Sequence, residues 1–346
     1  MVSADVRHNP CRAQLSTDAS CLITGVAGFV GSHLAQALLR LGRPVVGVDN
    51  FFSGLPENLT AFADHPGFTF HEGCVTDPHL LPRLRRDHPD LEVVFHLAAI
   101  VSVPHSMEHA AETLRVNRDA SLSLLSQAET LGLRRFVLAG SAAEYGNETR
   151  LPIRETYATD ETRQLSPYGR SKYEASRAVS RSPIGISLRF FNIYGERQVP
   201  TSPYSGVISK FIAQALAGRP LSIFGSGEQC RDFLHVADAV RAYLAVVGLG
   251  SPGRTPDSGV YNVGTGAGTT ILELADLIQR TVGNRPALRL EPPRPGDIAH
   301  SRADATAFVR ATGWRPTRPL DQGLRQTIDW LAEKTNGEAV PDAGLR

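Results

Sequence analysis

Three glycines near the start of the chain constrain the fold more than any other feature. Gly25, Gly28 and Gly31 follow an apolar run at 21–24 and precede a stretch of helical periodicity at 32–39. Between a strand and a helix, this spacing allows a tight turn and a close approach of the backbone to a pyrophosphate, because glycine has no side chain. The following helix would point the positive end of its dipole at the phosphates. The pattern therefore predicts the start of a Rossmann-type, dinucleotide-binding sheet.

A carboxylate placed 18 residues after Gly31 indicates which dinucleotide is bound. Asp49 ends a second apolar run at 44–49, where a carboxylate would accept hydrogen bonds from both hydroxyls of the adenosine ribose. The same charge would repel a 2′-phosphate, so we predict NAD as the cofactor in preference to NADP. Asp77 follows a third apolar run and has two interpretations, an acceptor for the adenine amino group or the N-cap of a helix.

Strands and helices alternate along the first half of the chain. Further strands are predicted at 69–72, 91–97 and 135–139, with helical stretches at 80–86 and 110–131. Such alternation implies right-handed crossovers and a doubly wound parallel sheet. The expected fold class is therefore α/β.

The type and spacing of the predicted helices and strands change after residue 185, and this change suggests the domain organisation. Short strands, a Pro/Ser loop and helices follow, which indicates a smaller C-terminal α/β lobe threaded back and forth with the main domain. We expect a disordered extension at 1–20, an NAD-binding domain at 21–185, a mainly substrate-binding lobe at 186–335 and a flexible tail at 336–346.

Composition argues against several classes of partner. The 346 residues carry a formal net charge of +1, which leaves no basic field to attract nucleic acid. No apolar run reaches the length of a membrane span, and the first 20 residues lack the apolar core of a signal peptide. The four cysteines show neither metal spacing nor a paired framework. We expect reduced thiols, no metal site and a cytoplasmic location.

A tyrosine and a lysine four residues apart predict the catalytic step. Tyr168 and Lys172 would share one face of a helix, and an ammonium near a phenol lowers the phenol pKa from about 10. The phenolate could then remove a proton from a hydroxyl while a hydride leaves the same carbon. Ser141, just beyond the strand at 135–139, could bind the reacting oxygen or merely cap a turn. Asn117 could support the site or serve as a buried structural amide.

Several further motifs accompany the catalytic pair. They are His-Leu-Ala-Ala at 96–99, Tyr-Gly at 145–146, Leu-Arg-Phe-Phe-Asn-Ile-Tyr-Gly at 188–195, Arg-Asp-Phe at 231–233, Tyr-Asn-Val-Gly at 261–264 and Arg-Pro-Gly-Asp at 294–297. With the glycines and the catalytic residues, these motifs resemble the extended short-chain dehydrogenase/reductase family, in its NAD-dependent nucleotide-sugar epimerase and dehydratase branch. The similarity runs from about residue 21 to residue 331, and is greatest to 4-epimerases of the UDP-N-acetylglucosamine type.

The resemblance implies residues for cofactor and substrate. Cofactor contacts would come from Gly25, Gly28, Phe29, Val30, Gly31, Asp49, Asn50, Asp77, Leu97, Ala98, Ala99, Asn117, Tyr168 and Lys172. Substrate contacts would come from Ser102, Val103, Ser141, Ala142, Tyr168, Asn192, Arg197, Gln198, Val207, Ile223, Arg231, Arg294, Asp297 and Ser301. Asn192, Arg231 and Arg294 would hold a diphosphate, since a guanidinium can donate two hydrogen bonds to one phosphate. The resemblance also implies a uridine nucleotide and a homodimer.

Two residues bear on the identity of the sugar. By the resemblance, Ser301 stands where galactose-type epimerases often carry a tyrosine that crowds C2, so a serine leaves room for an acetamido group. Its other interpretation is the start of a strand. Arg197 could instead pair with the carboxylate of a glucuronate. We expect NAD-dependent 4-epimerisation of UDP-N-acetylglucosamine and its galacto epimer through a 4-keto intermediate, with UDP-glucose and UDP-galactose as further substrates and UDP-glucuronate as the alternative.

Other functions remain open. A 4,6-dehydratase of this branch would carry an acid/base pair two and three residues before Tyr145, where this chain has Ala142 and Ala143. Glu144 is displaced by one residue, and in an extended segment this displacement turns a side chain to the opposite face. The same gap argues against a decarboxylase. A 4-keto-sugar reductase is a further alternative, and a non-catalytic NAD-binding regulator is disfavoured by the intact catalytic residues.

Overall fold

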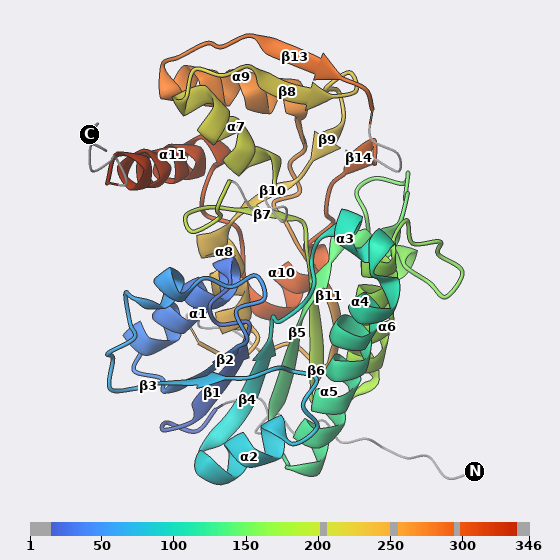
Figure 1. Ribbon diagram of the computed structural model, residues 1–346. Helices are drawn as coiled ribbons and strands as arrows, with labels where there is room; N and C mark the ends of the chain where they lie inside the picture. Colours follow the sequence, from blue (N-terminus) through green and yellow to red (C-terminus); the bar gives the residue numbers. More distant parts are fainter. Residues whose placement is uncertain (1–14, 201–205, 250–254, 294–297, 338–346) are drawn as a thin grey trace.

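A large parallel sheet flanked by helices, with a smaller lobe at one end, is the architecture that the computed structural model shows (Figure 1). The model describes residues 15–200, 206–249, 255–293 and 298–337. Arg294 and Asp297, both expected to bind the substrate, lie outside the described residues. Most of the expected N-terminal extension and C-terminal tail also lie outside them.

Seven parallel strands form the large sheet in the order β11-β6-β5-β4-β1-β2-β3. They are β1 (Ser20–Thr24), β2 (Val45–Asp49), β3 (Phe68–Glu72), β4 (Leu91–His96), β5 (Arg135–Ser141), β6 (Gly185–Phe190) and β11 (Gly259–Val263). The strand order reverses between β1 and β4, where doubly wound folds bind their ligands. The predicted Rossmann-type α/β fold is therefore confirmed.

Helices cover both faces of this sheet, which explains why its strands are nearly continuous apolar runs. The flanking helices are α1 (Phe29–Arg40), α2 (Leu80–Asp87), α5 (Ala120–Thr130), α6 (Pro167–Arg181) and α8 (Val236–Ala245). In β1, Cys21 and Ile23 pack into the core shared with α1 and α8, whereas Leu22 packs into the core shared with α2, α5 and α6. Successive residues of one strand thus stabilise two cores.

Two predicted boundaries differ from the structure. The helix expected at 110–131 is divided into α4 (Ala110–Leu114), a π-helical turn at Arg115–Asp119, and α5. A π-helical turn inserts one residue into the helical repeat and is frequent at functional sites. The strand expected at 135–139 continues for two residues, so Ser141 ends β5 instead of following it.

The smaller lobe is built from the later part of the chain. Its helices and strands are β7 (Asn192–Tyr194), α7 (Val207–Leu216), β8 (Leu221–Phe224), β9 (Cys230–Arg231), β10 (Phe233–His235), β12 (Thr269–Thr270), α9 (Ile271–Val282), β13 (Leu288–Glu291), β14 (His300–Ser301) and α11 (Leu320–Gly337). Apolar side chains of α7, α9, α11, β8 and β10 form a separate core. Two short helices, α3 (Val103–Glu108) and α10 (Thr306–Thr312), belong to the main domain's loops and edge (Figure 1).

The chain crosses between the two parts several times. Although the second lobe was expected to begin at residue 186, β6 and β11 both lie in the large sheet, and α8 packs beside α1. The sequence pattern therefore changes at residue 185, but this position is not a domain boundary, because residues 186–335 contribute to both parts of the fold.

Asp232 makes hydrogen bonds to segments of both parts of the fold. Its buried carboxylate lies between β9 and β10 and accepts hydrogen bonds from the backbone N–H groups of Thr265 (2.8 Å), Gly266 (2.9 Å) and Ala303 (3.1 Å). Thr265 and Gly266 follow β11 of the large sheet, whereas Ala303 follows β14 of the smaller lobe. Burial raises the pKa of Asp232, and these donors oppose the rise. One carboxylate therefore joins three segments that are distant in sequence.

We predict that Asp232→Ala lowers the free energy of unfolding by about 3 kcal/mol or more, because several buried N–H donors lose their acceptor at once. Urea unfolding of the full chain measures this loss. Asp329→Ala, which removes a carboxylate from the exposed surface of α11, is the matched control. Equal stability of the two variants would contradict the role given to Asp232.

Candidate functional site

A cavity of about 750 Å³ opens at the carboxyl ends of the strands in the large sheet. Of the residues expected to contact cofactor or substrate, it is lined by Gly25, Gly28, Phe29, Val30, Gly31, Asp49, Asn50, Leu97, Ala98, Ala99, Ser141, Tyr168, Lys172, Asn192, Arg197 and Gln198. These residues follow β1, β2, β4, β5 and β7 or lie on α6, so the parallel sheet gathers them at one edge.

The glycine turn has the shape that a pyrophosphate requires. Gly25 has a φ of +76°, and a Cβ there would lie 2.8 Å from the backbone nitrogen of Ala98. A Cβ on Gly31 would overlap the carbonyl oxygen of Gly25. Gly28 is the N-cap of α1 and carries no side chain that would cover the first turn of the helix. Bare backbone therefore faces the cavity where the helix begins, and an anion is favoured there.

The carboxylate of Asp49 is held at the opposite side of this turn. Its Oδ2 accepts a hydrogen bond from the N–H of Ala27 (2.9 Å), and its Oδ1 accepts one from the N–H of Phe51 (2.8 Å). A Cβ on Gly54 would come within 2.9 Å of both oxygens, so a glycine keeps this carboxylate accessible. Burial raises the pKa of Asp49, while the backbone donors lower it. These residues fit NAD, with the turn for its phosphates and Asp49 for its adenosine ribose.

The first turn of α6 positions the catalytic pair. Ser166 caps the helix by accepting a hydrogen bond from the N–H of Gly169 (3.1 Å), and Pro167 occupies the first helical position. Tyr168 and Lys172 then lie on one face and both line the cavity. Lys172 Nζ donates a hydrogen bond to the carbonyl oxygen of Ala139 on β5 (2.9 Å). The helix start thus places both side chains against the end of β5.

The pKa values in this pair differ from the sequence-based expectation. Burial raises the pKa of Tyr168 to about 12, and a hydrogen bond with Ser141 partly opposes the rise. Burial also lowers the pKa of Lys172 to about 8. In this structure Lys172 is not among the groups that lower the pKa of Tyr168, so the effect expected of it remains a prediction. Burial favours the neutral forms of both groups.

Ser141 has the capping role considered for it and also contacts Tyr168, while its binding of a reacting oxygen stays a prediction. Its side chain interacts with Tyr168 at the cavity, and it also accepts a hydrogen bond from the N–H of Ala143 (3.2 Å). Ser141 is therefore the N-cap of a short 3-10 helix, η4 (Ala142–Tyr145). The segment before Tyr145 is helical and not extended, so the face-switching argument made for Glu144 was based on the wrong backbone geometry.

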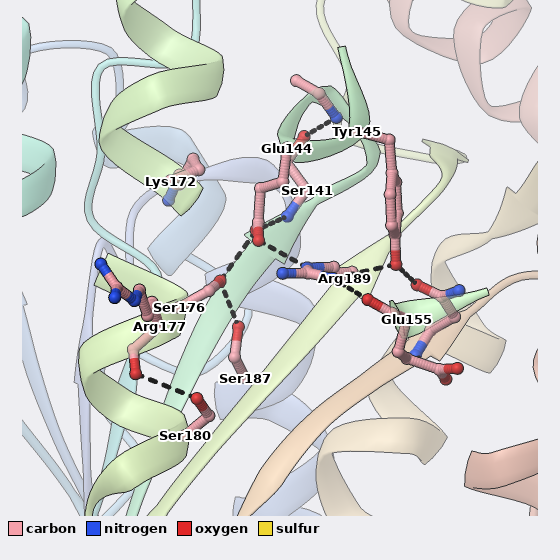
Figure 2. A network of polar contacts seen from close by, with 12 residues as sticks. Ser141, Glu144, Tyr145, Glu155, Lys172, Ser176, Arg177, Ser180, Ser187 and Arg189 are labelled. Atoms are coloured by element: carbon pink, nitrogen blue, oxygen red, sulfur yellow. Dashed lines mark hydrogen bonds and ion pairs between the residues drawn. The ribbon is translucent and has the colours of Figure 1, made fainter. Parts of the chain in front are cut away.

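Glu144 nevertheless points away from the cavity, into a buried polar network (Figure 2). Its Oε2 lies 2.5 Å from Nε of Arg189 on β6, and neither side chain is more than 3% exposed. Its Oε1 accepts hydrogen bonds from the N–H of Ser141 and from Oγ of Ser176 on α6, each at 2.8 Å. All oxygens of this carboxylate are occupied, so Glu144 is a structural acid. This role could not be predicted from the sequence, because no local pattern links Glu144 to Arg189, which is 45 residues away.

Tyr145 extends the same network to β11 at the edge of the large sheet (Figure 2). Its hydroxyl donates to Oδ1 of Asn262 (2.5 Å) and accepts from Arg189 Nη1 (3.1 Å). Glu155 in turn accepts a hydrogen bond from the N–H of Asn262 (2.8 Å). The Tyr-Gly, Leu-Arg-Phe-Phe-Asn and Tyr-Asn-Val-Gly motifs therefore meet in one place.

Two residues expected at the cofactor lie outside the cavity lining. Asp77 is at the surface, where Oδ1 accepts from the N–H of His79 (2.9 Å) and Oδ2 pairs with Arg83 (3.3 Å). The N-cap of α2 is His79, so Asp77 is not the helix cap considered for it but closes the turn that precedes the helix. Asn117 is a buried amide in the π-helical turn that bonds both backbone groups of Ile100 and Oγ of Ser171 (3.2 Å). Through these hydrogen bonds it joins the segment after β4 to the helix α6.

Several residues expected at the substrate have other surroundings. Outside the cavity lining lie Ser102, Val103, Ala142, Val207, Ile223, Arg231 and Ser301. Ser102 is the N-cap of α3, and Ile223 is buried in the core of the smaller lobe. Ser301 is 5% exposed on β14, beside Arg231 of β9. Arg197 lines the cavity, but its Nη2 donates to Oε1 of Gln36 on α1 (2.7 Å), which supplies a partner within the protein.

The cavity also has residues that no motif indicated. Among them are Phe52, Asn58, Cys74, Glu112, Arg115 and Tyr243. Most of these come from loops after β2 and β3 or from α4 and the π-helical turn, and Tyr243 reaches the cavity from α8. These residues lie on segments that are far apart in the chain, and the tertiary fold brings them together.

Within the described residues, no cluster of three or more His, Cys, Asp or Glu side chains could hold a metal ion. Among the same residues, no helix combines the length and the apolar character needed to cross a membrane.

Several known proteins resemble this chain in sequence and in fold. A model of the NAD dependent epimerase/dehydratase family matches residues 21–264. A UDP-glucose 4-epimerase of Mycolicibacterium smegmatis is 33% identical over 91% of this chain and 99% of the relative. UDP-glucuronic acid decarboxylase 1 of Danio rerio is 32% identical over 92% and 75%. The crystal structure of a UDP-N-acetylglucosamine 4-epimerase from Methanobrevibacter ruminantium, with UDP-N-acetylmuramic acid, is 31% identical over 92% and 100%, with a TM-score of 0.82.

The charge of Glu144 raises the pKa of both Tyr168 and Lys172. We predict that Glu144→Gln lowers the pKa of Tyr168, because the negative charge is lost and Arg189 is left uncompensated. A base that must be deprotonated then works at lower pH, so the acidic limb of the kcat/KM profile should move to lower pH. The melting temperature should also fall, since a broken buried ion pair costs about 3–5 kcal/mol.

Glu161→Gln is the matched control for this experiment, because it removes the same charge from an exposed loop. Its pH profile should equal that of the unaltered protein. Identical profiles for Glu144→Gln and Glu161→Gln would show that Glu144 has no electrostatic influence on the catalytic pair.

Proposed function

This chain belongs to the NAD-dependent epimerase/dehydratase family, and we propose that it inverts C4 of a UDP-hexose through a 4-keto intermediate. One observation carries the choice of reaction. Ser141, Tyr168 and Lys172 all line the cavity, whereas Glu144, the carboxylate of the loop between Ser141 and Gly146, is bound to Arg189 in the protein interior. The site thus has the groups for reversible oxidation of a hydroxyl without an acid/base pair for elimination.

The residues of the site divide the work of the reaction. NAD, when bound at the glycine turn and Asp49, supplies the acceptor for the C4 hydride and returns that hydride. Tyr168 removes the proton from the C4 hydroxyl and gives it back after the sugar has turned over. Ser141 donates a hydrogen bond to the reacting oxygen. Lys172, held by Ala139, keeps a cationic donor beside Tyr168 and favours its phenolate when protonated.

The other carboxylates of the described cavity lining do not supply an elimination pair. Asp49 is held by the N–H groups of Ala27 and Phe51 at the adenosine end. Glu112 lies 3.5 Å from Nε2 of His105, and its side chain is 41% exposed. These placements support epimerisation over a 4,6-dehydratase or a decarboxylase, although a decarboxylase is among the relatives. A 4-keto-sugar reductase would use the same three catalytic residues. The product analysis described below distinguishes it from an epimerase.

The substrate belongs to the same proposal. The relatives named above act on or bind uridine nucleotides, which supports a UDP-sugar. Arg197 uses Nη2 for Gln36 but keeps Nη1 without a partner among the described residues, so UDP-glucuronate is the alternative substrate that the experiment below tests. The resemblance implies that a serine at position 301 would leave space for an acetamido group, and on this basis we propose UDP-N-acetylglucosamine and its galacto epimer as substrates; Ser301 itself lies outside the cavity lining. A homodimer in the cytoplasm completes the proposal.

We predict that Tyr168→Phe retains NAD but loses turnover by about a hundredfold or more, the scale expected for removal of a general base. The enzyme is incubated with a panel of UDP-, GDP- and dTDP-sugars, and the products are separated by chromatography and weighed by mass spectrometry. A product of equal mass supports epimerisation. A 4-keto-6-deoxy sugar, a decarboxylated sugar or a net reduced sugar would replace the proposed reaction with another, and near-normal turnover in Tyr168→Phe would exclude this tyrosine as the base.

We predict that Ser301→Tyr impairs N-acetylated substrates selectively, by about tenfold or more in kcat/KM relative to UDP-glucose. Bulk inserted into a packed site costs about 1–3 kcal/mol, and the acetamido group competes for the same space. Ser301→Ala is the control, because it changes the residue without adding bulk. Equal losses with both sugars would indicate that the substitution disturbs β14, where Ser301 lies buried, and not the sugar pocket.

A further inference from the structure

Another cavity, of about 360 Å³, is lined by residues of α1, α8, α11 and the loop that follows β7. Three arginines from separate segments line it: Arg40 at the end of α1, Arg197 in the loop, and Arg318 just before α11. We call it the arginine cavity. The proposed epimerase reaction makes no use of Arg40 or Arg318.

The charges around the arginine cavity are unbalanced. Glu196 is the carboxylate of its described lining, and it lies 3.5 Å from Nε2 of His235. Burial lowers the pKa of His33 to about 4 and lowers that of His235, so both imidazoles are neutral near pH 7. Three guanidinium groups therefore face one carboxylate. Such an excess of positive charge in a partly desolvated space favours an anion.

Two hydrogen-bond donors of this lining have no acceptor among the described residues. They are Nη1 of Arg197 and Nε of Arg318, both buried. Arg197 uses Nη2 for Gln36, and no carboxylate in the described part of the chain lies within ion-pair distance of Arg40, Arg197 or Arg318. Buried donors without partners are rare in native proteins, and a ligand or water must satisfy them. The carboxylate of nearby Asp238 is already occupied by Arg241 and Thr317.

We propose that the arginine cavity binds a phosphate monoester of a small metabolite. Guanidinium groups match the oxygens of a phosphate, with two parallel hydrogen bonds to one anion. The first turn of α8 contributes the positive end of a helix dipole beside His235 and Ala237. The cavity is larger than a bare phosphate needs, and Trp330 of α11 offers it an aromatic surface for the organic part.

Arg197 connects this site to the catalytic cavity, because it lines both. Its φ of +68° is in the left-handed region that side chains other than glycine rarely adopt, so its conformation depends on surrounding contacts. Gln198 and Val199, the next residues, line the catalytic cavity. An anion that holds the Arg197 guanidinium would therefore change the affinity for UDP, and UDP would change the affinity for the anion by the same factor.

Calorimetric titration of the NAD-loaded full chain tests the site. UDP is added first to fill the diphosphate contacts of the catalytic cavity, the only step that rests on the proposed function. Glucose 1-phosphate is then titrated, and inorganic phosphate in a separate experiment. We expect glucose 1-phosphate to bind with UDP present and more tightly than inorganic phosphate. Arg318→Gln and Arg40→Gln should each weaken it by about tenfold or more, since each removes a charge-assisted contact.

Arg325→Gln is the matched control, because it removes a guanidinium from the exposed surface of α11 without touching the cavity. Its affinity for glucose 1-phosphate should equal that of the unaltered protein. Binding that UDP abolishes and that Arg318→Gln leaves unchanged would assign the anion to the catalytic cavity and overturn the proposal. Tighter binding of inorganic phosphate would overturn the choice of an ester, and a UDP affinity indifferent to glucose 1-phosphate would overturn the connection through Arg197.

Discussion

The buried ion pair between Glu144 and Arg189 holds together the segments that carry the proposed catalytic residues. It joins the end of β5 to β6, and Ser176 joins the same carboxylate to α6. A charge pair in the protein interior is stable only when further hydrogen bonds occupy its remaining atoms, and the N–H of Ser141 supplies one of them. Because β5 ends in Ser141 and α6 carries Tyr168, one carboxylate sets the distance between residues that must act together.

The same pair influences the chemistry of the site. Glu144 raises the pKa of Tyr168 and of Lys172, while burial moves the two groups toward their neutral forms. A carboxylate that is fully occupied in the interior also cannot act as an acid or base on a substrate. The ion pair that stabilises the catalytic elements thus removes the loop carboxylate from the reacting groups, which favours reversible oxidation over elimination.

Parallel topology explains why so many unrelated segments meet at one cavity. All seven strands of the large sheet point their carboxyl ends the same way, so the loops that follow them share one edge. The glycine turn, Asp49 and Ser141 come from three of these loops or strand ends. Arg197 comes from a loop of the smaller lobe, and its side chain reaches α1, so the two parts of the fold meet at its guanidinium.

Local sequence patterns were sufficient for the sheet, the cofactor turn and the catalytic pair. A glycine is needed where backbone must approach backbone, as at Gly25 beside Ala98, and a spacing of four residues places Tyr168 and Lys172 on one helix face. These requirements involve neighbours along the chain, so they are visible in its order of residues.

The directions of individual side chains depended on partners far away in the chain, and the order of residues does not encode them visibly. Glu144 turns inward because Arg189 lies 45 residues later on an adjacent strand. Arg197 turns to Gln36 across 161 residues. Burial, which depends on the packing of the whole fold, likewise determines the pKa values of Tyr168 and Lys172. Chain order thus establishes which chemical groups are present, and long-range packing establishes which of them can react.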